Sequence, residues 1–269
     1  MAVPDDIRRF AEEPDGRIPE PPSPARRIIT PSFVLVLSPV PAQSAVSTIR
    51  TTEAELDGVV AEVRRIATTE GYTRTVWFVG PSCRPVGLAA MLVARGFVPA
   101  DQPPFETEFT AMALVHPPPA TRNSVDARMV HTLDEYIEGV RIIMEAFGEP
   151  PAVTEEWLAA APRMWAANDG IRNLSHLAFL DGKPVGFSLT LAGTNGFLLG
   201  GSGVLPAARG RGAYRAMLAA RWQRAVELGR HALVIQAGAM SRPILERCGF
   251  ETVCTLTVLD DPTMAKPPG

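Results

Sequence analysis

The chain has 269 residues, of which 46% are hydrophobic and 20% are charged, so it can form one or two globular domains with a full core. A net charge of −3 gives no general attraction to nucleic acid or to an anionic membrane, and we expect neither as a partner. No apolar run approaches the roughly 20 residues that a membrane-spanning helix needs. The three cysteines, Cys83, Cys248 and Cys254, fit neither a disulfide framework nor a zinc site. We therefore expect reduced thiols, no bound metal and a cytoplasmic location.

The first half of the chain divides into a polar start and a unit that alternates strands and helices. Residues 1–31 are rich in proline and charge, which predicts an extended arm. The unit that follows, 32–118, has apolar residues spaced three and four apart between buried runs, which indicates an α/β domain. Strands are predicted at 32–39, 74–80 and 109–115, and helices at 52–71 and 85–96.

The stretch 116–124 breaks every regular pattern and is the predicted linker to a second unit, 125–262. Asp181-Gly182 has the residues of a two-residue hairpin turn. Thr154, followed by two glutamates, is expected to cap a helix. Helices are predicted at 133–147, 154–168, 212–228 and 240–250, and strands at 125–130, 176–193 (a hairpin), 197–206, 231–238 and 251–260.

The two units repeat each other weakly. "GPSCRP", beginning at Gly80, follows a strand in the first unit, and "GAMSRP", beginning at Gly238, follows a strand in the second. In each unit a helix, a Gly-Phe pair and another strand come next. This similarity suggests a duplicated fold.

A junction in the second unit gathers glycine and arginine where a strand passes into a helix: "LLGGSGVLPAARGRGAYRAML". The start of a helix has unpaired N–H groups and partial positive charge. Gly210 and Gly212 would let an anion approach the backbone, and Arg209, Arg211 and Arg215 would supply charge. The alternative is a flexible surface turn with solvated arginines.

Glycines inside the preceding strand favour the binding interpretation. Gly200, Gly201 and Gly203 are typical of a β-bulge or of close approach by another backbone. A bulge would splay this strand from its neighbour, and the freed backbone groups would pair with an extended amide chain. Coenzyme A carries both an amide chain and a pyrophosphate.

The second unit resembles the GNAT superfamily of acyl-CoA-dependent N-acyltransferases in two motifs. The family's central motif is a strand ending Val-x-Pro, then Arg/Gln-x-x-Gly-x-Gly/Ala, then a long helix. Here the strand ends at Val204 and the motif begins at Arg209, but Tyr214 stands where glycine or alanine is usual. A second motif, a strand and a short helix ending in Gly-Phe, is matched by "IQAGAMSRPILERCGF", with Ser241 at the polar position.

The resemblance implies an α/β GNAT fold: a mixed, mostly antiparallel sheet with splayed central strands, flanked by helices. It implies that the first unit is a second, degenerate copy without the phosphate loop. The implied co-substrate is acetyl-CoA or another acyl-CoA. The thioester carbonyl would lie near Val204, polarised by a backbone N–H. The implied coenzyme A-binding residues are Ser202, Gly203 and Val204 for the pantetheine amides, Gly210, Arg211, Gly212, Ala213, Tyr214 and Arg215 for the pyrophosphate, and Arg209 and Ser241 beside them.

The sequence indicates the general acid and the general base of this reaction less clearly than the donor-binding residues. Many family members place an acidic tyrosine where this chain has Leu245, so Ser241 or Tyr214 would serve, or the thiolate leaves unprotonated. Ser241 is also a candidate helix cap. The base candidates are Glu145, Glu149 and His176.

The function expected from the sequence is transfer of an acyl group from acyl-CoA to a small-molecule amine by direct attack in a ternary complex. Two alternatives stay open: a catalytically weak module that binds coenzyme A, and an acyltransferase that takes its donor from a carrier protein. Trp157 and Trp165 line the acceptor pocket or, more simply, pack in the core. We expect a monomer or a homodimer.

Overall fold

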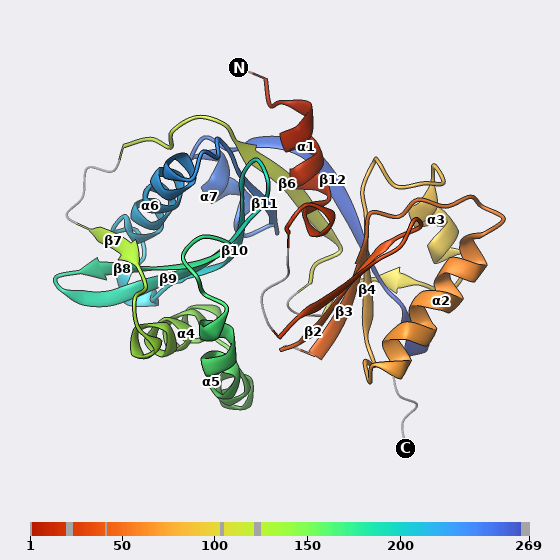
Figure 1. Cartoon of the computed structure of the whole chain (residues 1–269), viewed down its shortest axis with the longest axis horizontal. Helices are drawn as coiled ribbons and strands as arrows, with labels where there is room; N and C mark the ends of the chain where they lie inside the picture. The colour runs from red at the N-terminus through yellow and green to blue at the C-terminus, as the bar shows by residue number, and fades with distance from the viewer. Residues whose placement is uncertain (1, 20–23, 41, 103–104, 121–124, 265–269) are drawn as a thin grey trace.

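The computed structural model describes residues 2–19, 24–40, 42–102, 105–120 and 125–264. Its strands form one continuous sheet in which the two halves of the chain lie side by side (Figure 1). Within the described residues the strand order is β1-β2-β3-β4-β12-β6-β11-β10-β9-β8-β7, with β5 paired to β12. The sheet is mostly antiparallel, and its parallel pairs are β3–β4 and β10–β11.

The start of the chain differs from the expected extended arm. A helix occupies part of it, because Ile7, Phe10 and Ala11 lie on one face and are buried against the centre of the sheet. A short strand then pairs with the edge of the sheet. The first half contains α1 (Asp5–Glu12), β1 (Arg26–Ile29), β2 (Val34–Pro39), β3 (Ala42–Ser47), α2 (Leu56–Thr69), β4 (Thr75–Val79), α3 (Leu88–Val93), β5 (Val98–Pro99) and β6 (Glu108–Leu114).

The second half follows the predicted order of elements. The turn at Asp181 and Gly182 has the two positive φ angles, 52° and 75°, of the expected hairpin. Thr154 lies inside a helix, not at its start, and its hydroxyl donates to the carbonyl of Pro150. The elements are β7 (Asp126–Met129), α4 (Leu133–Phe147), α5 (Pro151–Ala166), β8 (Asn173–Leu180), β9 (Lys183–Ala192), β10 (Phe197–Val204), α6 (Ala213–Glu227), β11 (Leu233–Ala237), α7 (Arg242–Glu246) and β12 (Glu251–Asp260).

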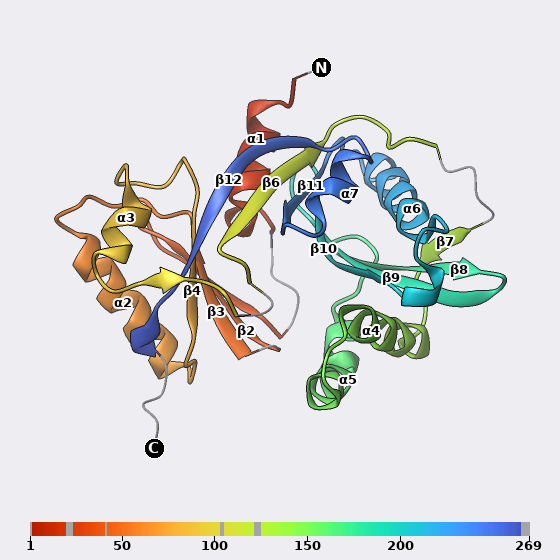
Figure 2. The ribbon, with the colours of Figure 1, turned by 180° about the vertical axis from the view of Figure 1, so that it is seen from behind.

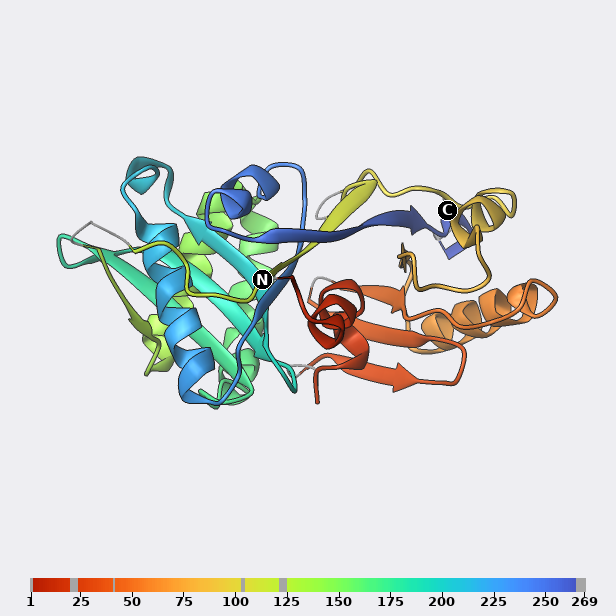
Figure 3. The same cartoon turned by 90° about the horizontal axis from the view of Figure 1, so that it is seen from above.

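The halves exchange strands at the centre of the sheet. β6, which ends the first half, pairs with β11 of the second. β12, which ends the second half, pairs with β4 of the first. β6 and β12 also pair with each other, so the long β12 runs from one half into the other (Figures 2 and 3). Strands of the sequence units 32–118 and 125–262 are therefore paired with each other in one sheet.

Helices cover the second half on both faces. Phe187 and Leu189 of β9 pack in a cluster with α4 and α5, and Leu191 packs with α1. Because alternate residues of a strand share a face, α1, α4 and α5 lie on one face. On the other face, Ala178 contacts Ala213 and Met217 of α6. We call these the α4 face and the α6 face.

Candidate functional site

The two central strands of the second half separate soon after they begin. β10 and β11 are parallel and are paired at Phe197–Leu233 and Leu198–Val234, although β10 continues to Val204. On its other side β10 stays paired with β9, with a register shift between Leu199 and Ser202. The predicted bulge is therefore present. Beyond Leu198 the described residues of β10 and β11 are no longer paired, and we call this separation of the two strands the slot.

The glycines of this strand have a second role that the sequence did not reveal. A Cβ added to Gly203 would lie 2.8 Å from the Cβ of Ala146 in α4, and one added to Gly201 would lie 3.1 Å from Ile143. Both glycines therefore allow α4 to pack directly on β10. Helix α4 borders the slot on its own face of the sheet.

The turn that leads into α6 has the backbone expected of an anion site. Gly210 and Gly212 have φ of 75° and 97°, a region that glycine adopts without strain. A Cβ added to Gly210 would meet nothing within 4 Å, so the space beside the turn is open. Gly212 is the N-cap of α6 and gives no side-chain cap to its N–H groups.

The three arginines of the turn are held differently. The Arg209 guanidinium donates to the carbonyls of Val204 (3.3 Å) and Ala146 (2.7 Å), and so links β10 to the end of α4. Arg211 is 3.5 Å from Asp181, which belongs to the β8–β9 turn. Arg215 is exposed in the first turn of α6. The structure thus places Arg211 and Arg215 at the turn and directs Arg209 toward α4.

Ser202 and Tyr214 face a buried arginine that sequence analysis missed. Arg221 of α6 is fully buried and donates to the Ser202 hydroxyl at 3.1 Å. Its guanidinium lies 6.0 Å from the ring centroid of Tyr214, and burial raises the pKa of that phenol. The side chain of Tyr214 therefore lies inside the α6 face. Its neighbour Ala213 is buried there too.

Ser241 begins the short helix α7 without capping it. Its hydroxyl donates to the carbonyl of Gly238 at 3.2 Å, so the expected cap is wrong. Leu245, at the family's tyrosine position, is fully buried. Cys248 is buried nearby, and burial raises the pKa of its thiol, as in a packed cysteine.

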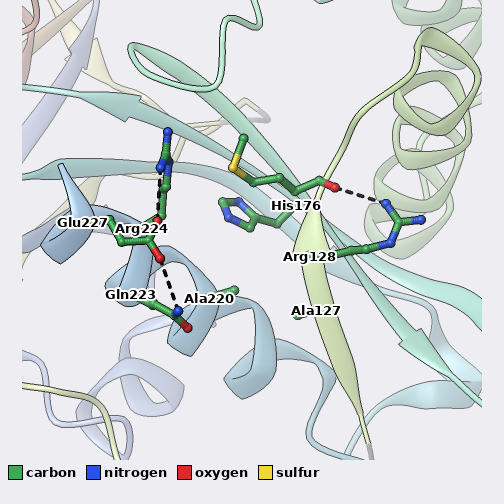
Figure 4. Close-up of a pocket in the computed structure, with 8 residues that line it drawn as sticks. Ala127, Arg128, His176, Ala220, Gln223, Arg224 and Glu227 are labelled. Atoms are coloured by element: carbon green, nitrogen blue, oxygen red, sulfur yellow. Dashed lines mark hydrogen bonds and ion pairs between the residues drawn. The ribbon is translucent and has the colours of Figure 1, made fainter.

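The base candidates lie on different faces. Glu145 is exposed in the last turn of α4, next to Ala146, which contacts β10. His176 lies on the α6 face, in a pocket beside Gln223, Arg224 and Glu227 (Figure 4). Burial lowers the pKa of His176 to about 3, so the ring is neutral. The structure therefore separates His176 from α4 and its last turn.

The aromatic candidates pack in the core under α4. The ring centroids of Tyr136 and Trp165 lie 5.7 Å apart, and Tyr136 meets Phe187 edge-on. Trp157 and Met164 belong to the same cluster. These contacts support the core interpretation of both tryptophans.

The first half contains an equivalent of the slot, filled by its own chain. β3 and β4 are parallel from Ser44–Thr75 to Val46–Trp77. At the end of β3, Ser47 donates to Asp15, and beyond β4 the backbone and hydroxyl of Ser82 donate to Glu12. The segment 12–15 thus lies across the ends of both strands.

The helix that follows β3 also lacks the basic turn. Glu53, Glu55 and Asp57 surround the start of α2. These carboxylates would repel a pyrophosphate where the second half has three arginines.

A carboxylate beside the second slot also escaped sequence analysis. Glu106, just before β6, accepts a hydrogen bond from the backbone N–H of Ala239 at 2.8 Å. Its other oxygen would clash with a Cβ added to Gly238, so the carboxylate packs directly against that glycine. The sequence pointed to this place only through the repeated segments that begin at Gly80 and Gly238. That repeat does not indicate which residue lies against either glycine.

Three solved structures that align with most of this chain are described as GNAT proteins or GCN5-related N-acetyltransferases. A GCN5-related N-acetyltransferase from Kribbella flavida aligns with 98% of this chain and 96% of its own, at 19% identity and a TM-score of 0.68. A tandem GNAT protein from the clavulanic acid biosynthesis pathway aligns with 97% of this chain and 89% of its own, at 17% identity and a TM-score of 0.62. A GCN5-related N-acetyltransferase from Sphaerobacter thermophilus covers 86% of this chain and 80% of its own, at 18% identity and a TM-score of 0.59.

No family model matches the sequence, and no curated protein is similar to it. None of the described helices combines the length and apolar character needed to cross a membrane. The splayed strands, the helices on both faces and the alignment over nearly the whole chain agree with one another. The chain has the GNAT fold in a tandem arrangement, and its turn rich in glycine and arginine lies in the second copy.

Proposed function

We propose that this chain is an acyl-CoA-dependent N-acyltransferase, with acetyl-CoA as donor and a small-molecule amine as acceptor. One observation carries the proposal: β10 and β11 separate directly before a turn with two positive-φ glycines and the start of α6. An amide chain followed by a pyrophosphate fits this succession of unpaired strand backbone and helix start.

The donor would enter with its charged end at α6. Backbone N–H groups of the first turn would bind the pyrophosphate, with Arg211 and Arg215 adding charge. The backbone of β10 from Ser202 to Val204 would pair with the pantetheine amides. Arg209 supports this strand from the side, since it joins the carbonyl of Val204 to that of Ala146.

The reaction would be direct. The acceptor ammonium first loses a proton to solvent water, and the neutral nitrogen attacks the thioester carbonyl. The C–N bond forms, the C–S bond breaks to release the thiolate, and the second proton lost from the nitrogen also goes to water. A backbone N–H of β10 near Val204 would stabilise the oxyanion. Because Leu245 replaces the usual tyrosine and Tyr214 is turned into the α6 face, the thiolate would leave without a tyrosine acid. Because a thiol has a pKa of ~8.5, its thiolate is stable enough near neutral pH to leave without being protonated first.

The first half would not bind a donor. Glu12 and Asp15 occupy the ends of β3 and β4, and the start of α2 is acidic. We propose that this half supports the second, and that one molecule of acetyl-CoA binds per chain.

The experiment compares Gly210→Ala with a matched control, Gly71→Ala. Both glycines have positive φ (75° and 85°) and open space around a new Cβ, so each variant pays a similar backbone strain of ~1–3 kcal/mol. Calorimetric titration with acetyl-CoA should give a Kd at least ~10-fold weaker for Gly210→Ala, and an unchanged Kd for Gly71→Ala. Thiol release with a panel of amines completes the test.

The proposal is overturned if the wild-type protein binds no acetyl-CoA and releases no thiol with any amine. If Gly210→Ala and the wild-type protein have the same Kd for acetyl-CoA, the donor does not bind at this turn.

A further inference from the structure

Two carboxylates occupy equivalent places in the two copies. Glu12 lies against Gly80, which follows β4, and Glu106 lies against Gly238, which follows β11. Each glycine begins one of the repeated segments, "GPSCRP" and "GAMSRP". The two carboxylates differ in how many of their oxygens accept hydrogen bonds from the chain.

Glu12 is fully engaged. It is only 9% exposed, and its two oxygens accept hydrogen bonds from the backbone N–H of Ser82 at 2.6 Å and from the Ser82 hydroxyl at 2.8 Å. A carboxylate with both oxygens bonded and little access to water is a structural link. Glu12 links α1 to the segment that follows β4.

Glu106 is only partly engaged. One oxygen accepts the N–H of Ala239, and among the described residues no hydrogen bond reaches the other. The side chain is half-buried, so it keeps contact with solvent. An ionised carboxylate can accept about four hydrogen bonds, so Glu106 retains acceptor capacity.

The position of Glu106 places it on the acceptor side of the slot. Gln236 of β11 donates to the carbonyl of Glu12 in α1, so its side chain lies on the α4 face. Gly238 is two residues further, and residues two apart share a face. In the proposed function the donor's charged end would bind at the start of α6, on the opposite face. Glu106 therefore stands where an acceptor would approach from the α4 face.

The charged groups on this side of the slot are two carboxylates, Glu106 and Glu145, and one guanidinium, that of Arg209. Glu145 is exposed in the last turn of α4, and the carbonyl end of a helix carries partial negative charge. Arg209 satisfies one of these carbonyls. Glu106 adds a full negative charge at the neighbouring strand, which favours a cation.

We propose that Glu106 is an acceptor-binding residue that receives the ammonium group of a cationic alkylamine. The residue belongs to the first copy and is brought to the second slot by the strand exchange, so the acceptor site is composite. This inference rests on the proposed function and names the class of amine. It also gives the first copy a role in recognition.

The test uses Glu106→Gln, with Glu108→Gln as the matched control. The amide oxygen of glutamine can still accept the N–H of Ala239, so the local fold is kept while the charge is lost. Glu108 is exposed and lies two residues away, at the start of β6. Steady-state kinetics are measured with acetyl-CoA and two sets of acceptors: primary alkylamines, which are cationic at neutral pH, and arylamines, which are neutral.

Glu106→Gln should lower kcat/KM for alkylamines by roughly 10- to 100-fold through the KM of the amine, and leave arylamines within about 3-fold. The KM for acetyl-CoA should not change. Glu108→Gln should match the wild-type protein with both sets.

Equal losses with alkylamines and arylamines would mean that Glu106 only shapes the turn at Ala239, and would overturn the inference. Unchanged kinetics in Glu106→Gln with an active wild-type protein would overturn it too, and would leave the proposed function intact. A wild-type protein without acetyl-CoA binding or thiol release would overturn both.

Discussion

At the scale of single residues, the carboxylates of the first copy lie in surroundings that change their chemistry. Burial raises the pKa of the Asp15 carboxyl above its ordinary value, although the hydrogen bond from Ser47 and the charge of Arg27 act in the opposite direction. A raised folded-state pKa means that the folded chain binds the proton more tightly than the unfolded chain. The ionised form of Asp15 therefore costs stability at neutral pH, and this cost disappears as the pH falls below the unfolded-state value.

Asp15→Asn should accordingly increase the free energy of unfolding at pH 7, because asparagine can still accept the Ser47 hydroxyl without a buried charge. The gain should shrink as the pH is lowered toward 4, because the folded chain takes up a proton on Asp15 at a higher pH than the unfolded chain does. Urea unfolding at pH 7 and pH 4 measures both values, and Asp101→Asn, at an exposed site outside the helices and strands, is the control. A loss of stability at pH 7 would show that the charge of Asp15 is favourable where it lies.

The backbone of the turn that we propose as the donor site could be predicted because its residues lie close together in the sequence. Gly210, Gly212 and the arginines between them form one local pattern, and local patterns carry backbone geometry. Glu106 could not be found in this way, since it meets Ala239 across a separation of 133 residues. Arg209 shows a further limit: its charge was evident, but its contact with Ala146 depends on how α4 packs.

At the scale of elements, the packing of α4 on β10 shapes one wall of the slot. Gly203→Ala would place a Cβ 2.8 Å from the Cβ of Ala146 and 3.3 Å from the backbone of Ile143, so the helix must move away. We expect a loss of about 1–3 kcal/mol in the free energy of unfolding. Because the same displacement changes the wall of the slot, acetyl-CoA should also stabilise this variant less.

The matched control is Gly58→Ala in α2, where an added Cβ meets nothing within 4 Å. This change should stabilise the chain by roughly 0.5–1 kcal/mol, because alanine favours a helix interior. Thermal unfolding with and without acetyl-CoA measures all three proteins. If Gly203→Ala unfolds like the wild-type protein, α4 is not in rigid contact with β10.

Elements with strong periodicity could be predicted well. The expected helix at 133–147 coincides with α4, because its apolar residues recur at helical spacing. The strand β3 was missed, since "AQSAVS" has few of the residues that favour strands. Helix α1 was missed because the proline content of 1–31 outweighed the helical spacing of Ile7, Phe10 and Ala11.

At the scale of the whole molecule, the exchange of β6 and β12 joins the two copies into one sheet. The predicted linker separates the halves in sequence, but a repeat of local patterns does not say which copy a strand joins. β11 has β6 as its antiparallel neighbour, and β4 has β12. Each copy thus completes its sheet with a strand from the other, and neither can bury its central strands alone.

This exchange predicts that the halves do not fold independently. A fragment of residues 125–269 lacks β6, so β11 becomes an open edge, and β12 loses its antiparallel partners β4, β5 and β6. We expect fragments 1–118 and 125–269 to show no cooperative urea transition when they are prepared alone. The full chain should unfold in one transition that is the same by far-UV circular dichroism and by tryptophan fluorescence, since Trp77 reports on the first half and Trp165 on the second.

A nicked chain distinguishes two effects: loss of the covalent link between the halves, and loss of the strands that each half receives from the other. With a protease site inserted between 118 and 125 and cut after folding, both halves are present and the exchanged strands are already paired. The two pieces should stay together in size-exclusion chromatography and keep a single transition. A 125–269 fragment that unfolds cooperatively, and that acetyl-CoA stabilises as strongly as the full chain, would show that the second copy needs no strand from the first. Such a fragment would also lack Glu106, so its kinetics with alkylamines would test the composite acceptor site directly.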